Sequence, residues 1–164
     1  VEEGDAIQAL ERVSDGTLAC VSLMHLAEHL PFEKLRRLVQ NAWRVLVPEG
    51  ILIMETPNPE NLVVGSCNFY MDPTHQHPLP PRLLAFVPEY YGFERVKILR
   101  LQEDPALRNR PRVKVADLFH GVSPDYAVVA QKSRPLDASQ SEQRCWEQEY
   151  GIDFASLKQR LTDD

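Results

Sequence analysis

The sequence predicts an α/β protein with a mostly parallel sheet. Two continuous apolar runs of strand length, residues 17–23 and 51–54, flank residues 31–46, whose apolar positions recur three and four apart. Strands that are apolar throughout are typical of parallel sheets, and a helix between two of them makes a βαβ unit. Because such sheets bind ligands at the carboxyl ends of their strands, the polar residues that follow 17–23 and 51–54 are predicted to share one crevice.

Turn residues and periodicity predict the other elements. The helix at 31–46 ends at a turn over 47–50, which contains Pro48 and Gly50. The last two strands are joined without a long crossover, so they are predicted to run antiparallel. The other expected elements are the end of a strand at 1–4, short helices at 7–13 and 62–64, a helix at 81–91 capped by Gly92, a strand at 93–101, a helix at 113–119, a strand at 125–131, and helices at 142–150 and 154–161.

Two parts of unequal size are expected. Residues 1–132 are predicted to form one partial domain, and residues 133–164 a polar linker followed by a helical tail. Apolar and aromatic residues recur in the tail at near-helical spacing, so it is expected to pack on the domain or to pair with a second copy.

Composition excludes several classes of function. A net charge of −6 over 164 residues argues against nucleic acid as a partner, which needs a basic field. No apolar run approaches the roughly 18 residues of a membrane span, and the first residues resemble no signal peptide. The three cysteines are scattered without CxxC spacing, so a reducing cytoplasm is expected, with Cys20 buried in its strand. The first residue is not Met, so the chain is expected to begin inside a longer protein.

Three motifs, in this order, resemble the class I S-adenosylmethionine (SAM)-dependent methyltransferases. They are Gly4-Asp5-Ala6, the turn His25-Leu26-Ala27-Glu28-His29-Leu30, and Arg44-Val45-Leu46-Val47-Pro48-Glu49-Gly50-Ile51-Leu52-Ile53. Residues 55–61 followed by 69–75 are similar to a subgroup associated with the assembly of surface polysaccharide and O-antigen. The resemblance covers roughly 1–132. It implies a partial Rossmann-like three-layer sandwich and methyl transfer from SAM to an oxygen nucleophile, such as a polysaccharide-linked hydroxyl or phosphate.

The resemblance also implies cofactor contacts. In the family, the acidic residue after the third strand contacts the adenine amino group, and Asp5 and Ala6 match this position. The residues after the fourth strand, here Met24 and His25, line the cofactor or substrate pocket. An equal alternative is that Gly4-Asp5 is only a turn and a helix cap.

Methyl transfer is a direct displacement, so the protein mainly aligns the nucleophile with the methyl group. A base is needed where the acceptor loses a proton, and His25 suits that role; the alternative is a hydrogen-bonded histidine at a strand end. The loop at 65–81, whose polar and aromatic part is 68–78, is long for a compact domain, as functional loops are. The predicted substrate-binding residues are Glu55, Asn58, Tyr70, Asp72 and His75; the alternative is a proline-stiffened surface loop with satisfied histidines.

The motif His25-x-x-Glu28-His29 raises a metal hypothesis, because some related methyltransferases carry Glu-x-x-Glu-His here and bind a divalent ion. In this chain His25 replaces the first Glu, and Pro31 argues against the helix that would align the three side chains. A metal-dependent hydrolase would need three convergent ligands, which the sequence offers on separate loops. The sequence therefore predicts no metal site.

One departure from the family's pattern is an absence. The sequence has seven glycines and no GxGxG, so the glycine-rich SAM loop and the strand after it are missing from it. Without those strands residues 17–23 would be a bare edge, predicted to be covered by a second copy, the tail or a rearranged N-terminus. The alternative function is therefore a truncated, non-catalytic methyltransferase-like remnant that forms a homodimer or binds a partner.

Overall fold

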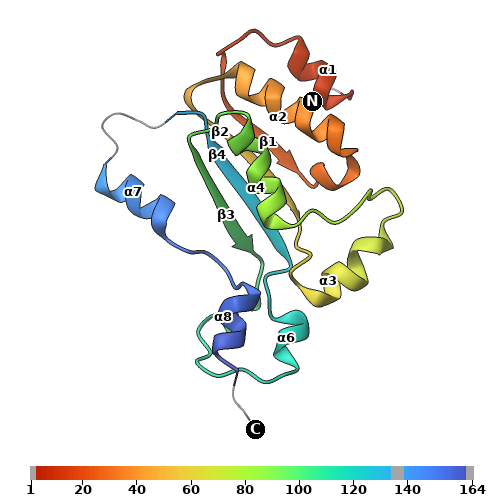
Figure 1. The fold of residues 1–164 in the computed structure, drawn as a ribbon, viewed down its shortest axis with the longest axis vertical. Helices are drawn as coiled ribbons and strands as arrows, with labels where there is room; N and C mark the ends of the chain where they lie inside the picture. The colour runs from red at the N-terminus through yellow and green to blue at the C-terminus, as the bar shows by residue number, and fades with distance from the viewer. Residues whose placement is uncertain (1–2, 134–138, 162–164) are drawn as a thin grey trace.

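The computed structural model describes residues 3–133 and 139–161, built around a four-stranded sheet (Figure 1). The sheet order is β1-β2-β4-β3. β1 and β2 are parallel, and β4 runs antiparallel to both of its neighbours, so three strands share one direction. This confirms the α/β fold with a mostly parallel sheet and an antiparallel C-terminal strand. The strands are β1 (Leu18–Met24), β2 (Leu46–Pro57), β3 (Arg95–Leu101) and β4 (Asp125–Gln131).

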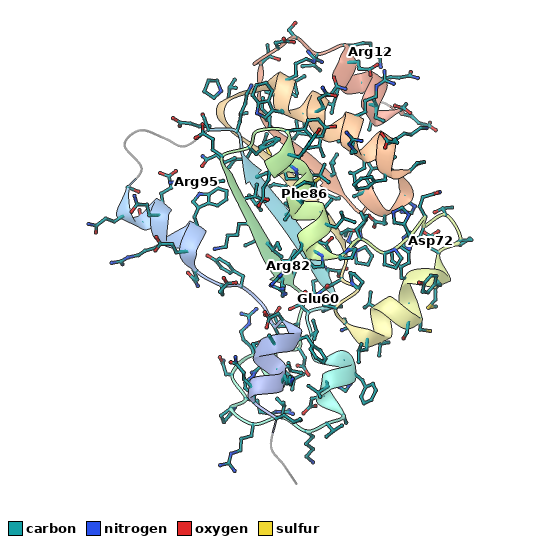
Figure 2. All side chains as sticks on the ribbon, viewed as in Figure 1. Arg12, Glu60, Asp72, Arg82, Phe86 and Arg95 are labelled. Carbon is teal, nitrogen blue, oxygen red and sulfur yellow. The ribbon has the colours of Figure 1, made fainter. Side chains whose placement is uncertain are left out.

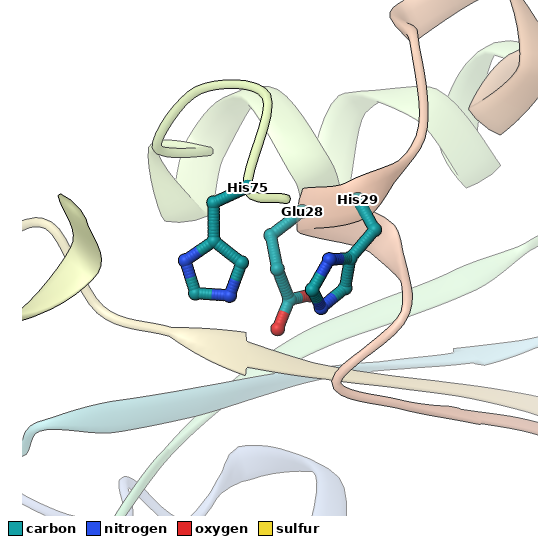
Figure 3. Close-up of side chains that lie close together, drawn as sticks. All are labelled: Glu28, His29 and His75. Atoms are coloured by element: carbon teal, nitrogen blue, oxygen red, sulfur yellow. The ribbon is translucent and has the colours of Figure 1, made fainter. Parts of the chain in front are cut away.

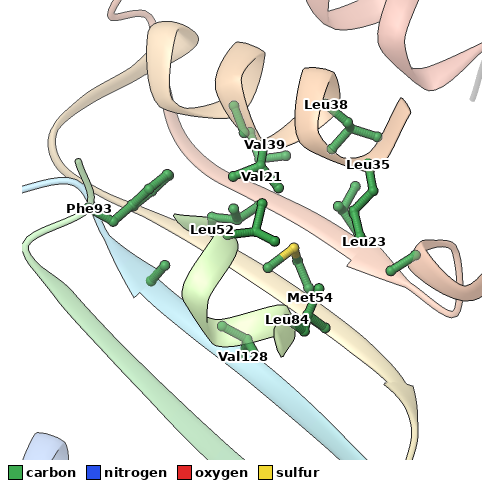
Figure 4. Close-up of a cluster of buried hydrophobic side chains, with 14 of the residues drawn as sticks. Val21, Leu23, Leu35, Leu38, Val39, Leu52, Met54, Leu84, Phe93 and Val128 are labelled. Atoms are coloured by element: carbon green, nitrogen blue, oxygen red, sulfur yellow. The ribbon is translucent and has the colours of Figure 1, made fainter. Parts of the chain in front are cut away.

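Two helices, α2 (Phe32–Val45) and α4 (Pro81–Tyr90), cover one face of this sheet. The core between them and the sheet is shown in Figure 4, where Met54 of β2 lies beside Leu84 of α4. Burial of each leucine in such a core stabilises the fold by about 1.5–3 kcal/mol relative to exposure. The predicted βαβ unit is confirmed down to its buried positions on α2, which are Leu35, Leu38, Val39, Ala42 and Val45.

The turn predicted at 47–50 lies inside β2. Pairing with β1 jumps from Leu18–Leu46 to Cys20–Ile51, so these residues form a bulge rather than the end of an element. Glu49 takes a left-handed φ of 64° within it. The strand continues through the bulge because neighbouring segments still satisfy the backbone there: Glu49 N–H donates to the Ser133 hydroxyl, and the Gly50 carbonyl accepts from Lys132 N–H.

The other face of the sheet is only partly covered. The prediction that Cys20 is buried is wrong, because no described helix packs over this face of β1 and the thiol is exposed. No strand among residues 3–133 and 139–161 pairs with the outer side of β1. The tail crosses this face near β3, where Lys97 Nζ donates to the carbonyls of Cys145 and Trp146 at 2.8 Å each. It then buries Ile152 and Leu157 in a second small core.

The shorter elements are close to those predicted. The helix expected at 113–119 begins only at Asp117, because Val113 pairs with Leu161 in an isolated bridge. Residues 1–2 and 134–138, on which parts of the expected first strand and of the linker fall, lie outside the described residues, and 3–5 form no strand. Within the described part of the chain no helix is long and apolar enough to cross a membrane. The other elements are α1 (Ala6–Glu11), the 3₁₀-helices η1 (Ala27–His29) and η2 (Asn68–Met71), α3 (Leu62–Ser66), α5 (Pro105–Arg108), α6 (Asp117–His120), α7 (Gln140–Glu147) and α8 (Phe154–Gln159).

Candidate functional site

The carboxyl ends of β1 and β2 lie side by side, as the sequence predicts. Met24 pairs with Glu55, and the His25 N–H donates to the Glu55 carbonyl at 3.0 Å, which extends the ladder by one residue. His25 then takes a left-handed φ of 48°, a conformation that is uncommon outside glycine and that turns the chain into η1. The backbone therefore brings His25 and Glu55 together at one end of the sheet.

Acidic groups surround the His25 imidazole. Nδ1 lies 3.3 Å from Glu28 Oε1, and Nε2 lies 3.5 Å from Glu55 Oε1. Asp125, at the start of β4, is close enough to interact with them: burial raises the pKa of its carboxyl, His25 opposes this, and Glu55 and Glu28 raise the pKa further. The His25 side chain is 47% exposed while that of Glu28 is fully buried, so the imidazole is the accessible member of the group.

The loop at 68–78 folds back onto η1. The Gln76 N–H donates to the Glu28 carbonyl at 2.8 Å, and Thr74 Oγ1 lies 2.9 Å from His29 Nδ1. The ring of His75 contacts the ring of His29 at 4.6 Å between centroids and that of Phe69 at 4.4 Å. The contact with His29 joins two segments that lie far apart in the sequence, and Figure 2 labels Asp72 of the same loop.

The structure places the predicted substrate residues in different environments. Glu55 lies beside His25, and His75 lies near Glu28 and His29. Hydrogen bonds from the Thr74 side chain and backbone hold the pKa of Asp72 below its usual value. Tyr70 is 63% exposed. Asn58 is buried instead: its Nδ2 donates to the Ser123 carbonyl and its Oδ1 accepts from Glu60 N–H, so its amide supports the fold and is not available to a substrate.

Glu28 and Thr56 follow the two predicted strands and are predicted to share one crevice. The structure shows that both are buried and that the Thr56 hydroxyl donates to Glu28 Oε2 at 2.9 Å. The Thr56 side chain points to the opposite face from that of Glu55, as alternation along a strand requires. The sequence pattern gave no sign of this burial or of the hydrogen bond, because both depend on the packing around the strand ends.

The residues expected to hold the adenine moiety lie at the N-terminus of α1. Asp5 is its N-cap: Oδ1 accepts from the backbone N–H groups of Ile7 and Gln8 at 2.9 and 3.0 Å. The hydrogen bond from Gln8 is the largest cause of a lowered Asp5 pKa, to which nearby Lys34 and Arg37 contribute. The cap engages Oδ1 alone, so the exposed carboxylate fits a second role as acceptor for an amino group.

Met24 and Ala6 are the other residues predicted to contact the adenosine part of the cofactor. Met24 ends β1 with a side chain that is 55% exposed, and Ala6 is the first residue of α1. Met24 and Asp5 are both exposed, as residues that bind an adenine ring must be. A cavity of about 620 Å³ lies elsewhere, against β3 and α7, and none of these residues lines it.

Comparison with known proteins agrees with this geometry. A SAM-dependent methyltransferase from Archaeoglobus fulgidus is 31% identical, with a TM-score of 0.71, over 80% of this chain and 67% of that one. The SAM-dependent methyltransferase SibL in its apo form has a TM-score of 0.56 at 13% identity, over 81% of this chain and 35% of its own. A possible histamine N-methyltransferase from Thermotoga maritima has a TM-score of 0.55 at 13% identity, over 79% of this chain and 62% of its own.

No protein-family model and no curated protein matches the sequence. The mixed α/β sheet is that of a class I methyltransferase fold. Because the Archaeoglobus enzyme is similar in both sequence and structure over two thirds of its length, the chain belongs to the SAM-dependent methyltransferases.

Proposed function

We propose that the strand-end site transfers a methyl group from SAM to a hydroxyl, with a polysaccharide-linked hydroxyl as the substrate class. One observation carries the proposal: the accessible His25 imidazole lies between the carboxylates of Glu28 and Glu55, at the point where the fold binds its ligands. A phosphate acceptor fits less well, because the carboxylates of Glu28, Glu55 and Asp125 would repel its negative charge.

The roles follow from the chemistry. SAM supplies an electrophilic methyl group, so the chain has to hold the acceptor oxygen in line with it. His25 accepts the proton that the hydroxyl loses, and the carboxylates on either side stabilise the resulting imidazolium. Asp5, Ala6 and Met24 hold the adenosine part of SAM. Glu55, Tyr70, Asp72 and His75 position the acceptor, and the exposed Tyr70 ring offers apolar surface to a sugar.

Transfer of a labelled methyl group tests this proposal. The chain is incubated with methyl-labelled SAM and oligosaccharides that carry free hydroxyls, with matched phosphorylated oligosaccharides alongside. We expect label on the unphosphorylated sugars, a kcat lowered by about 10²–10⁴-fold in His25→Gln, and no change in His77→Gln, which alters an exposed histidine of the neighbouring loop. Equal transfer by His25→Gln and the unaltered chain would contradict the role of His25.

A second candidate is association without catalysis. The outer side of β1 has no partner strand among the described residues, and Cys20 and Met24 are exposed beside it. Light scattering over a range of concentrations tests this candidate. A dimer that binds no S-adenosylhomocysteine and transfers no label would favour it over methyl transfer.

A further inference from the structure

Three potential metal ligands from two separate segments converge beside the strand-end site. Glu28 and His29 come from η1, and His75 comes from the loop that folds onto it. One ligand atom from each lies within 4.8 Å of the other two. Figure 3 shows the Glu28 side chain between the two imidazole rings. The sequence predicts no such site, because it does not show that the loop brings His75 to η1.

Hydrogen bonds hold both imidazoles in the tautomer that a metal requires. His75 Nδ1 lies 2.6 Å from the Phe69 carbonyl, to which it donates its proton. The Thr74 hydroxyl donates to Asp72 Oδ1 at 2.6 Å, so it accepts from His29 Nδ1 at 2.9 Å. Both rings therefore keep an Nε2 lone pair, and a bond from the other ring nitrogen to a carbonyl or hydroxyl is the usual support of a metal-bound histidine.

Glu28 contributes a second, independent observation. Its side chain is fully buried, and Oε1 has no hydrogen-bond partner among the described residues, although His25 Nδ1 lies 3.3 Å away. Thr56 satisfies only the other oxygen. A buried carboxylate oxygen without a donor costs about 1–3 kcal/mol, or more when it is charged, so the fold retains an unsatisfied negative atom where a cation would satisfy it.

We propose that Glu28, His29 and His75 bind one divalent first-row transition metal ion. Two imidazoles and one carboxylate suit Zn²⁺, Mn²⁺ or Fe²⁺, whereas Mg²⁺ and Ca²⁺ prefer oxygen ligands alone. Asp72 Oδ2 lies 3.9 Å from His75 Nε2 and is placed to serve as a fourth ligand. Three protein ligands leave positions open for water or for an oxygen of a bound molecule. The inference does not depend on which molecule accepts the methyl group.

Metal binding is measured directly on the untagged chain. After treatment with a chelator, the protein is dialysed against Zn²⁺, Co²⁺ or Mg²⁺, and bound metal is counted by emission spectrometry. The visible spectrum of the Co²⁺ form reports nitrogen and oxygen coordination at a low coordination number. We expect one Zn²⁺ or Co²⁺ per chain, no retained Mg²⁺, and an unfolding temperature that rises with Zn²⁺ concentration.

Variants distinguish metal binding at Glu28, His29 and His75 from non-specific metal binding at the protein surface. His75→Gln and His29→Gln are each expected to weaken Zn²⁺ at least about tenfold and to abolish the Co²⁺ spectrum, whereas His77→Gln, in the same loop and exposed, leaves both unchanged. The unfolding temperature without metal shows whether a variant remains folded. Absence of stoichiometric Zn²⁺ in the unaltered chain, or equal loss in His77→Gln, would overturn the proposal and leave water as the partner of Glu28 Oε1.

Discussion

The buried hydroxyl of Thr56 gives a stability prediction that can be worked from the structure. Thr56 Oγ1 makes the one hydrogen bond that the described residues give to the Glu28 carboxylate, at 2.9 Å, and both side chains are buried. Thr56→Val replaces the hydroxyl with a methyl group of similar size. The substitution leaves the packing largely intact and leaves both oxygens of a buried carboxylate without a donor.

The magnitude follows from the charge on the acceptor. A hydrogen bond to a charged group contributes about 1.5–3 kcal/mol, and the orphaned acceptor keeps its desolvation cost. We therefore expect Thr56→Val to lower the free energy of unfolding by about 1.5–3 kcal/mol, a fall of about 3–12 °C in the unfolding temperature for a chain of this size. The double variant Thr56→Val/Glu28→Met should lose less than the sum of the single losses, because removing both partners leaves no buried charge.

Urea unfolding in the presence of a chelator measures these values without any contribution from metal. Thr17→Val is the matched control: it removes an exposed hydroxyl that donates to the Ser14 carbonyl at 2.9 Å, and it should change stability by no more than about 0.5 kcal/mol. If Thr56→Val costs no more than Thr17→Val, or if Thr56→Val and Glu28→Met add without coupling, the account of Glu28 as a buried charged group is refuted.

Two further predictions concern the second core and the tail. Burial alone would raise the pKa of Glu103, but hydrogen bonds from its own backbone amide and from Arg108 hold it below its ordinary value of 4.5. Glu103→Gln should therefore cost about 1–3 kcal/mol at pH 7, and urea unfolding at several pH values should show the difference closing as the pH falls below that ordinary value. Gly151 has a φ of 76°, and a Cβ there would lie 2.3 Å from the Arg100 carbonyl oxygen. Gly151→Ala should release the tail to proteolysis, whereas Gly16→Ala, at a φ of 61° with open space around it, should not.

The elements that the sequence predicts best are those with a clear local pattern of apolar residues. Residues 31–46 show a helical stripe and lie between two continuous apolar runs, so the βαβ unit and the proximity of its two strand ends could be predicted from the pattern alone. The predicted antiparallel pairing of β3 and β4 is confirmed, although the connection between them, residues 102–124, includes α5 and α6 and is long enough for a crossover. The residues at 47–50 were misassigned because Pro48 and Gly50 indicate a turn equally well when they form a bulge inside a strand.

The candidate site could be predicted only in part. His25 and Glu55 follow their strands directly, so their proximity is a consequence of topology. His75 reaches η1 because the Gln76 N–H binds the Glu28 carbonyl, and no periodicity in a loop encodes that register. Asn58 was predicted to bind substrate because it is polar and follows a strand. A buried asparagine can equally form hydrogen bonds with the surrounding backbone, as Asn58 does with the Ser123 carbonyl.

The proposed function requires this chain to form the cofactor and acceptor sides of a methyltransferase site. The most direct measurement is calorimetric titration with S-adenosylhomocysteine of the unaltered chain, Asp5→Ser and Asp5→Ala. Serine retains the cap of α1 but is too short to reach an adenine amino group, whereas alanine removes both functions.

We predict saturable binding to the unaltered chain. Binding should be weakened about tenfold in both variants, with a lower unfolding temperature in Asp5→Ala alone. Binding of equal strength in the unaltered chain and Asp5→Ser would reduce Asp5 to a helix cap. Absence of saturable binding by the unaltered chain would show that it forms no cofactor site and would contradict the proposed function.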